Sequence, residues 1–258
     1  MPKFAANLSM MFNEWEFLDR FAAAADAGFR AVEYLFPYAY APDDIAARLE
    51  RHGLAQALFN LPPGDWNAGE RGLAALPERA AEFDASVATA LSYVAATNVK
   101  RVHVMSGNAR ASDGTARAAY ERAIRYAAER MGERGVEVVI EPINKRDMPA
   151  FFLNDFGLAV EIIKAIGAPN LKLQYDVYHR QILHGDVMKS LEALLPLIGH
   201  VQVASVPARN EPGTGELNDE RIFRHLDAIG YQGFVGCEYR PAGKTLDGLG
   251  WFAPWREG

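Results

Sequence analysis

The chain alternates between short apolar runs and longer segments whose apolar residues recur at helical spacing. In the first half, this pattern predicts strands at 4–10, 31–36, 54–60 and 101–105 and helices at 16–27, 42–52, 78–97 and 115–133. In the second half it predicts strands at 136–141, 171–176, 199–205 and 233–239 and helices at 155–166, 186–197, 218–229 and 244–252. The regular alternation is typical of parallel β-strands connected by helices.

About eight strand–helix units within 258 residues predict an α/β fold of the closed (β/α)8 TIM-barrel type, with residues 1–258 forming one catalytic domain. No GxGxxG or P-loop pattern favours an open, doubly wound sheet instead. In a TIM barrel the carboxyl ends of all strands meet at one mouth, where active sites are built. The residues at those ends are therefore the candidates for a functional site.

Four oxygen-bearing side chains stand in or just after the apolar runs of the second half: Glu141, Asp176, Gln202 and Glu238. They are separated by 35, 26 and 36 residues, which is one strand–helix unit each. Burying an unpaired carboxylate is costly, so these residues require a cation, a hydrogen-bond network or a cleft. An ordinary ion pair explains any one of them, but the repetition favours a shared site at the mouth.

Three carboxylates and one amide form an oxygen-only ligand set, which suits Mg²⁺ or Mn²⁺ rather than structural zinc. A divalent metal held by Glu141, Asp176, Gln202 and Glu238 would polarise a carbonyl group and stabilise an enediolate. Glu141 and Glu238 would then act as the catalytic acid and base. The pattern therefore indicates exchange of a carbonyl group with an adjacent hydroxyl.

Four further residues are predicted to bind the substrate. Arg71 and Arg209 lie in loops expected at the mouth, where either can clamp a carboxylate. Asp147 and His179 follow Glu141 and Asp176 closely enough to contact substrate hydroxyls. Arg71 belongs to the segment 61–72, which has Pro and Gly but no regular period and is predicted to be an ordered functional loop.

Composition narrows the function classes and the location. The net charge of −6 and the absence of a dense basic run disfavour nucleic acid as a partner. Cys237 is the single cysteine, which excludes an intrachain disulfide. The N-terminal segment has no signal-peptide layout, and no apolar run is long enough to suggest a membrane span, so we expect a cytoplasmic protein. A homo-oligomer is compatible with all of this.

Several segments resemble the hydroxypyruvate isomerase family of the xylose isomerase-like barrels. They are FAANLSMMF, GFRAVEYLFPY, LPPGDWNAGERG, IEPINKRDMPAFF, LQYDVYH, EPGTGE and GCEYRP, and they extend over essentially the whole chain. The resemblance implies catalytic glutamates at Glu141 and Glu238, and a divalent ion held by these two residues with Asp176 and Gln202. It also implies that the protein interconverts hydroxypyruvate and tartronate semialdehyde, a small hydroxy-oxo acid substrate.

The resemblance also leaves alternatives. Phe59 precedes Asn60 where hydroxypyruvate isomerases often have His, and this segment is closer to relatives that isomerise 2-oxotetronate to 3-oxotetronate. A Phe in the pocket wall is expected to change substrate preference. Ketose 3-epimerases share the rim but have His where this chain has Gln202. A non-catalytic sugar- or acid-binding barrel is a further alternative, because fold alone does not determine function.

Overall fold

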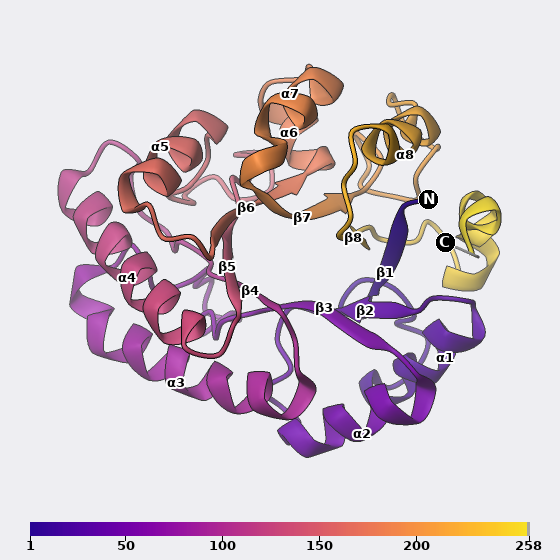
Figure 1. Cartoon of the computed structure of the whole chain (residues 1–258), viewed down its shortest axis with the longest axis horizontal. Helices are drawn as coiled ribbons and strands as arrows, with labels where there is room; N and C mark the ends of the chain where they lie inside the picture. Colours follow the sequence, from indigo (N-terminus) through magenta and orange to yellow (C-terminus); the bar gives the residue numbers. More distant parts are fainter. Residues whose placement is uncertain (257–258) are drawn as a thin grey trace.

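The computed structural model describes residues 1–256 and places eight parallel strands in one closed barrel (Figure 1). The strands follow one another in sequence order, and the last pairs with the first, so the predicted TIM-barrel fold is confirmed. The predicted domain's last two residues, 257–258, lie outside the described part. The strands are β1 (Lys3–Asn7), β2 (Ala31–Glu33), β3 (Ala55–Asn60), β4 (Arg101–His103), β5 (Glu137–Ile140), β6 (Leu171–Asp176), β7 (Ile198–Val203) and β8 (Phe234–Cys237).

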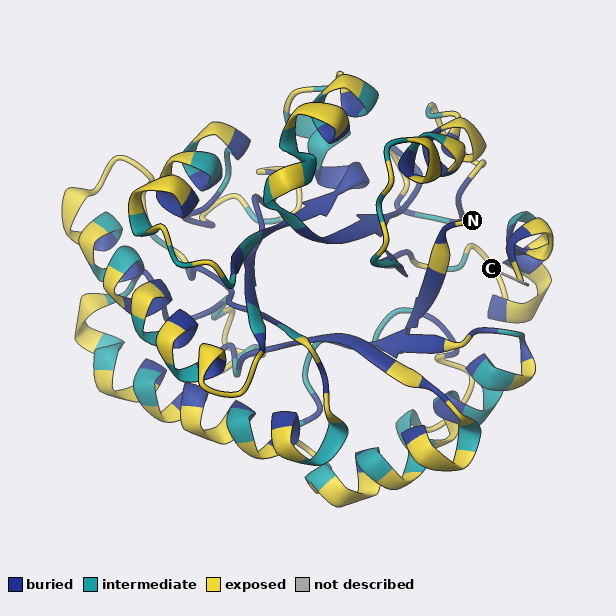
Figure 2. Ribbon diagram, viewed as in Figure 1, coloured by how far each residue is buried: buried dark blue, intermediate teal, exposed yellow. Residues whose placement is uncertain are grey.

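Helices surround the barrel and turn their buried residues toward it, while their outer faces are exposed (Figure 2). Within residues 1–256, no helix combines the length and apolar character needed to cross a membrane. The α-helices are α1 (Arg20–Asp26), α2 (Pro42–His52), α3 (Ala80–Thr97), α4 (Gly114–Gly132), α5 (Phe156–Ile166), α6 (Val177–Leu183), α7 (Val187–Leu194) and α8 (Asp219–Ala228). The 3-10 segments are η1 (Phe17–Asp19), η2 (Pro77–Arg79), η3 (Leu195–Leu197) and η4 (Thr245–Trp255).

The helices predicted at 16–27 and 78–97 begin as the 3-10 turns η1 and η2, and the second half of the chain differs further from the predictions. Helix α6 was not predicted, and it begins directly after Asp176, whose side chain accepts a hydrogen bond from the Tyr178 N–H. The helix predicted at 186–197 is α7 followed by the 3-10 turn η3, because Pro196 has no N–H with which to continue an α-helix. The closing helix is of the 3-10 type and extends to Trp255.

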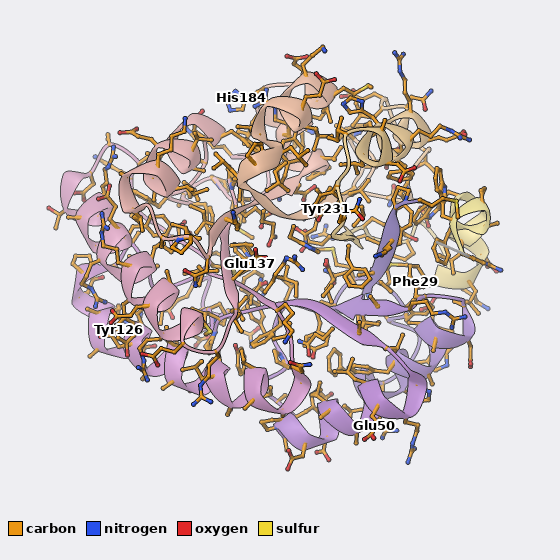
Figure 3. All side chains as sticks on the ribbon, in the orientation of Figure 1. Phe29, Glu50, Tyr126, Glu137, His184 and Tyr231 are labelled. Carbon is orange, nitrogen blue, oxygen red and sulfur yellow. The ribbon has the colours of Figure 1, made fainter. Side chains whose placement is uncertain are left out.

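The inside of the barrel has an apolar layer below a polar one. Ala5, Ala31 and Ala57 form a small cluster toward the start of the strands. Two residues further along β1 and β2, on the same strand faces, Asn7 and Glu33 are buried. Side chains fill the ring of strands (Figure 3). This arrangement places buried polar groups next to the mouth, where the predicted ligands stand.

Candidate active site

The strand ends bring Glu141, Asp176 and Glu238 together with His179. One potential ligand atom from each of these buried residues lies within 4.8 Å of the others. Glu141 follows β5, Asp176 ends β6 and Glu238 follows β8, so the three carboxylates reach one point from three strands. This group can hold a metal ion, although its geometry does not identify which one.

The two oxygens of Asp176 have different surroundings. Oδ1 accepts the Tyr178 N–H at 2.8 Å and thereby caps α6. Oδ2 is buried, has no hydrogen-bond partner within residues 1–256, and lies 3.6 Å from His179 Nε2. The helix start therefore fixes one oxygen and leaves the other directed at the cluster.

Glu141 shows the same division. Its Oε2 accepts a hydrogen bond from Gln174 Nε2 at 3.0 Å, whereas Oε1 is buried without a partner in the described part of the chain. His179 Nε2 lies 3.7 Å from this oxygen. Two unpaired buried carboxylate oxygens, one each from Glu141 and Asp176, are what a divalent cation would satisfy, so these residues fit a hard metal ion.

Gln202 lies beside the cluster, as predicted. In the barrel register it is paired with Asp176, and its Oε1 accepts a hydrogen bond from Gln174 Nε2 at 2.6 Å. Because the same Gln174 nitrogen also donates to Glu141, the Gln202 carbonyl and the Glu141 carboxylate are both within hydrogen-bond reach of one atom. All four predicted ligands therefore belong to one neighbourhood.

His179 faces the cluster as a donor. Its Nδ1 lies 2.7 Å from Asn144 Nδ2, and Asn144 Oδ1 accepts the Asp147 N–H at 2.9 Å, which fixes the orientation of the amide. An amide nitrogen can only donate, so Nδ1 of His179 is the acceptor and Nε2 carries the proton. Burial, with the nearby Arg209, lowers the pKa of His179 well below its usual value. The neutral ring thus directs an N–H at Glu141 and Asp176.

Arg209 supplies the positive charge of the site. Its Nη2 donates to Glu238, and its Nη1 donates to Asp147 at 3.2 Å. Its guanidinium carbon lies 4.9 Å from the centre of the Tyr178 ring, and the Tyr178 hydroxyl donates to Asp147 at 3.2 Å. Of the four predicted substrate-binding residues, Arg209 and His179 therefore lie against the carboxylates, and Asp147 contacts Arg209 and Tyr178 next to them.

The carboxylates hold their protons more tightly than usual. Burial raises the pKa of Glu238 to about 7 and that of Asp176 to about 6, although Arg209 opposes both shifts. Burial, together with the charges of Glu238 and Asp176, raises the pKa of Glu141 well above its usual value. Groups with pKa values near neutrality suit proton transfer, and a divalent cation would relieve their mutual repulsion.

Arg71 is held within its own loop. Its guanidinium carbon lies 3.8 Å from the centre of the Trp66 ring, and Nη1 donates to the backbone oxygens of Trp66 and Glu70. Glu70 in turn forms an ion pair with Arg79 at 2.6 Å. These contacts agree with the predicted ordered loop. They do not bring Arg71 to the carboxylates, so its substrate contact stays a prediction.

Phe59 does not line the pocket. Its ring is fully buried and packs against Tyr93 of α3 and against Tyr38, with ring centres 6.2 and 6.3 Å away. The side chain therefore lies between the barrel and its helical layer. The expectation that a Phe here changes the pocket wall is wrong, because the strand turns this position outward.

Sequence reasoning missed three polar residues beneath the cluster: Glu33, Gln174 and His200 are buried inside the barrel. His103, which the apolar strand RVHVM predicts to be a core histidine with satisfied hydrogen bonds, is also buried, but neither ring nitrogen has a hydrogen-bond partner within residues 1–256, and its Nε2 lies 3.8 Å from Glu141. Burial lowers the pKa of His103 to about 3. For Glu33 a signal was present, because it is a carboxylate inside the apolar run AVEYLF, the same pattern that indicated Glu141.

Comparisons with known proteins identify the family. The sequence model of the xylose isomerase-like TIM barrel matches residues 21–255. The chain is 53% identical to the 2-oxo-tetronate isomerase of Cupriavidus necator over 257 residues, 99% of each chain. It is 42% identical to the hydroxypyruvate isomerase of Escherichia coli over 258 residues, 99% of this chain and 100% of the relative.

A solved structure from Brucella melitensis, described as an AP endonuclease of family 2, is similar in both fold and sequence. It superposes with a TM-score of 0.97 at 48% identity and covers 99% of this chain and 100% of its own. A 3-keto-D-glucoside 4-epimerase from E. coli, at 19% identity and a TM-score of 0.78, shares the fold. The chain therefore belongs to the xylose isomerase-like TIM barrel family, and it is an isomerase.

Proposed function

We propose that this protein interconverts a short 2-oxo acid and its carbonyl isomer through an enediolate, with 2-oxotetronate as the preferred substrate. One observation supports the chemistry above all: Glu141 and Glu238, whose pKa values are raised by burial, converge with Asp176 on one point of the barrel mouth. Two acid–base groups beside a hard cation site suit removal and return of a proton next to a carbonyl.

The metal site that we propose consists of Glu141, Asp176, Gln202 and Glu238, with Mg²⁺ or Mn²⁺ as the ion. The unpaired oxygens of Glu141 and Asp176 within residues 1–256 support this assignment. When bound, the ion polarises the oxo group and stabilises negative charge on the neighbouring oxygens. His179 is left out of the ligand set, because its Nε2 carries a proton while Nδ1 accepts from Asn144.

The residues of the chain move the proton. One glutamate takes the C–H proton from the hydroxyl-bearing carbon, which leaves an enediolate, and the other returns a proton to the former carbonyl carbon. The hydroxyl proton passes to the former oxo oxygen, so atoms and electrons balance. His179 donates its Nε2–H to a substrate oxygen, Arg209 clamps the carboxylate, and Asp147 accepts from a hydroxyl. Arg71 completes this carboxylate clamp if its loop moves inward.

The relatives guide the choice of substrate. Proteins named 2-oxo-tetronate isomerase are 53%, 46% and 42% identical to this chain, which favours the four-carbon acid. The 42% identity to the E. coli hydroxypyruvate isomerase supports the three-carbon acid as a second candidate. We also propose that the chain forms a single catalytic domain, because the proposed metal ligands come from β5 to β8 of one closed barrel.

Two other functions are less well supported. Cleavage of DNA at abasic sites requires a His-rich zinc cluster and a basic surface, whereas the described cluster has one histidine and the chain has a net charge of −6. A ketose 3-epimerase would use similar acid–base groups, but the relatives at 42% identity and above are named for isomerisation of oxo acids. Solved epimerases at about 19% identity share only the fold.

Exchange of solvent deuterium into 2-oxotetronate and hydroxypyruvate, followed by NMR with Mg²⁺ or EDTA, tests the proposal. Glu141→Gln and Glu238→Gln are expected to slow the exchange by about 10²- to 10⁴-fold. Glu137→Gln is the matched control. Glu137, labelled in Figure 3, begins β5 and forms an ion pair with Arg101 at 2.9 Å. It lies about 13 Å along the strand from Glu141. Equal exchange in all variants, or none with either acid in the wild type, would refute the mechanism.

A further inference from the structure

Glu33 is a fully buried carboxylate that reaches across the barrel. It stands on β2, yet its Oε1 accepts from Gln202 Nε2 at 2.8 Å and its Oε2 lies 2.7 Å from His200 Nε2, both on β7. Asn7 of β1 donates to Oε1 at 3.0 Å. A buried carboxylate needs this many donors to offset its desolvation, and here they come from both sides of the barrel.

The barrel makes room for this carboxylate at Gly236. A Cβ at this position of β8 would lie 2.2 to 2.4 Å from three atoms of the Glu33 carboxyl group, so only glycine allows the carboxylate to cross. In the barrel register Gly236 is paired with Gln202. The space left by the missing side chain is therefore where Glu33 meets the Gln202 amide.

Two contacts orient the Gln202 amide: Glu33 accepts a hydrogen bond from its Nε2, and Gln174 donates one to its Oε1. The two ends of an amide have nearly the same shape, but only Oε1 can ligate a cation. A carboxylate only accepts hydrogen bonds, so it holds the Nε2 end. Oε1 then faces the opposite way, where it accepts from Gln174 Nε2, the nitrogen that also donates to Glu141.

We propose that Glu33 is a positioning residue that fixes the Gln202 amide with its Oε1 directed at the metal site. This role rests on the proposed metal site, because Glu33 itself does not contact the four-residue cluster of Glu141, Asp176, His179 and Glu238 among the described hydrogen bonds and ion pairs. Replacing Glu33 by glutamine removes the obligatory acceptor, and the Gln202 amide can then present its nitrogen to the cation.

Binding of Mn²⁺ in the absence of substrate, measured from the electron paramagnetic resonance signal of the free ion, tests the proposal without reference to any reaction. Glu33→Gln keeps the side-chain volume and is expected to weaken Mn²⁺ binding about 10- to 100-fold, as loss of an outer partner of a ligand typically does. Glu33→Asp keeps the charge but withdraws the carboxylate from Gln202, so it is also expected to weaken binding. Glu137→Gln, the same substitution outside the network, should leave affinity unchanged.

A reversed pair supplies the rescue. In the double variant Glu33→Gln with Gln202→Glu, residue 33 becomes the donor and residue 202 an anionic ligand that needs no orientation, so Mn²⁺ affinity should recover. Thermal unfolding in EDTA confirms that each variant is folded. If Glu33→Gln binds Mn²⁺ as tightly as the wild type does, Glu33 has no positioning role. The same conclusion follows if only Glu33→Asp keeps wild-type Mn²⁺ affinity. Either result would leave the proposed metal site intact. A wild type that binds no Mn²⁺ would refute the metal site and this role together.

Discussion

Proton competition at the proposed metal site gives a quantitative prediction. A cation binds the ionised carboxylates, so each proton held by Asp176 or Glu238 must leave before Mn²⁺ binds. Their usual pKa values of 3.8 and 4.5 are raised by burial to about 6 and about 7. We therefore expect Mn²⁺ binding to weaken strongly on acidification through a range in which ordinary surface carboxylates remain ionised.

The magnitude follows from these pKa values. At about pH 5.5, protonation of Asp176 weakens apparent binding about 4-fold and that of Glu238 about 30-fold, whereas at about pH 8 both are essentially ionised. From these two residues alone, the dissociation constant should rise by at least about 100-fold between the two pH values, which corresponds to about 3 kcal/mol. Glu141, whose pKa is also raised, acts in the same direction.

Calorimetric titration with Mn²⁺ at both pH values measures this ratio. Glu238→Gln removes the roughly 30-fold contribution of this residue, so the ratio should fall by about that factor. Asp219→Asn is the matched control: burial raises the pKa of Asp219 to about 6, but this residue stands on α8 and accepts from the Gly213 N–H, outside the cluster. Its variant should keep the full ratio. A wild-type dissociation constant that is the same at both pH values would refute the reasoning.

Three further variants test other parts of the structure. Gly72→Ala should destabilise the protein by about 2 to 4 kcal/mol in urea unfolding, because φ is +113° and the new Cβ would lie 2.3 Å from the Met105 carbonyl oxygen; unchanged stability would contradict this packing. Burial lowers the pKa of His103 from 6.5 to about 3, so below pH 6.5 only the unfolded chain binds this proton and the folded state loses stability. His103→Gln should recover up to about 2 kcal/mol of that loss at pH 5, and the same pH dependence of stability in variant and wild type would contradict this. Arg209→Lys should raise KM about tenfold with a smaller change in kcat, since lysine cannot bind a carboxylate bidentately; a change in kcat alone would exclude the clamp.

The barrel and the placement of the four candidate ligands were predictable because their signals are local. Each strand is an apolar run, and each ligand stands at the end of such a run, so spacing alone places Glu141, Asp176, Gln202 and Glu238 at one mouth. The family resemblance pointed to the same residues. The convergence of Glu141, Asp176 and Glu238, whose ligand atoms lie within 4.8 Å of one another, follows from the closed barrel.

The network beneath the site was not predictable in the same way. The partners of Glu33 are 26, 167 and 169 residues away in sequence, and only barrel closure determines that they meet. The side of the strand on which Phe59 lies was also missed, because an unbroken apolar run has no alternation from which to assign faces. Helix α6 escaped prediction because its start signal, Asp176, had been assigned wholly to the metal.

Asp176 and Glu33 show how one fold serves stability and chemistry with the same atoms. Asp176 uses one oxygen to begin α6 and directs the other at the cluster, so the helix start determines where the cluster oxygen lies. Glu33 uses its carboxylate to join β1, β2 and β7, and the same contacts orient the Gln202 amide. In both residues, the position of the carboxylate oxygens is fixed by backbone segments that the barrel already requires.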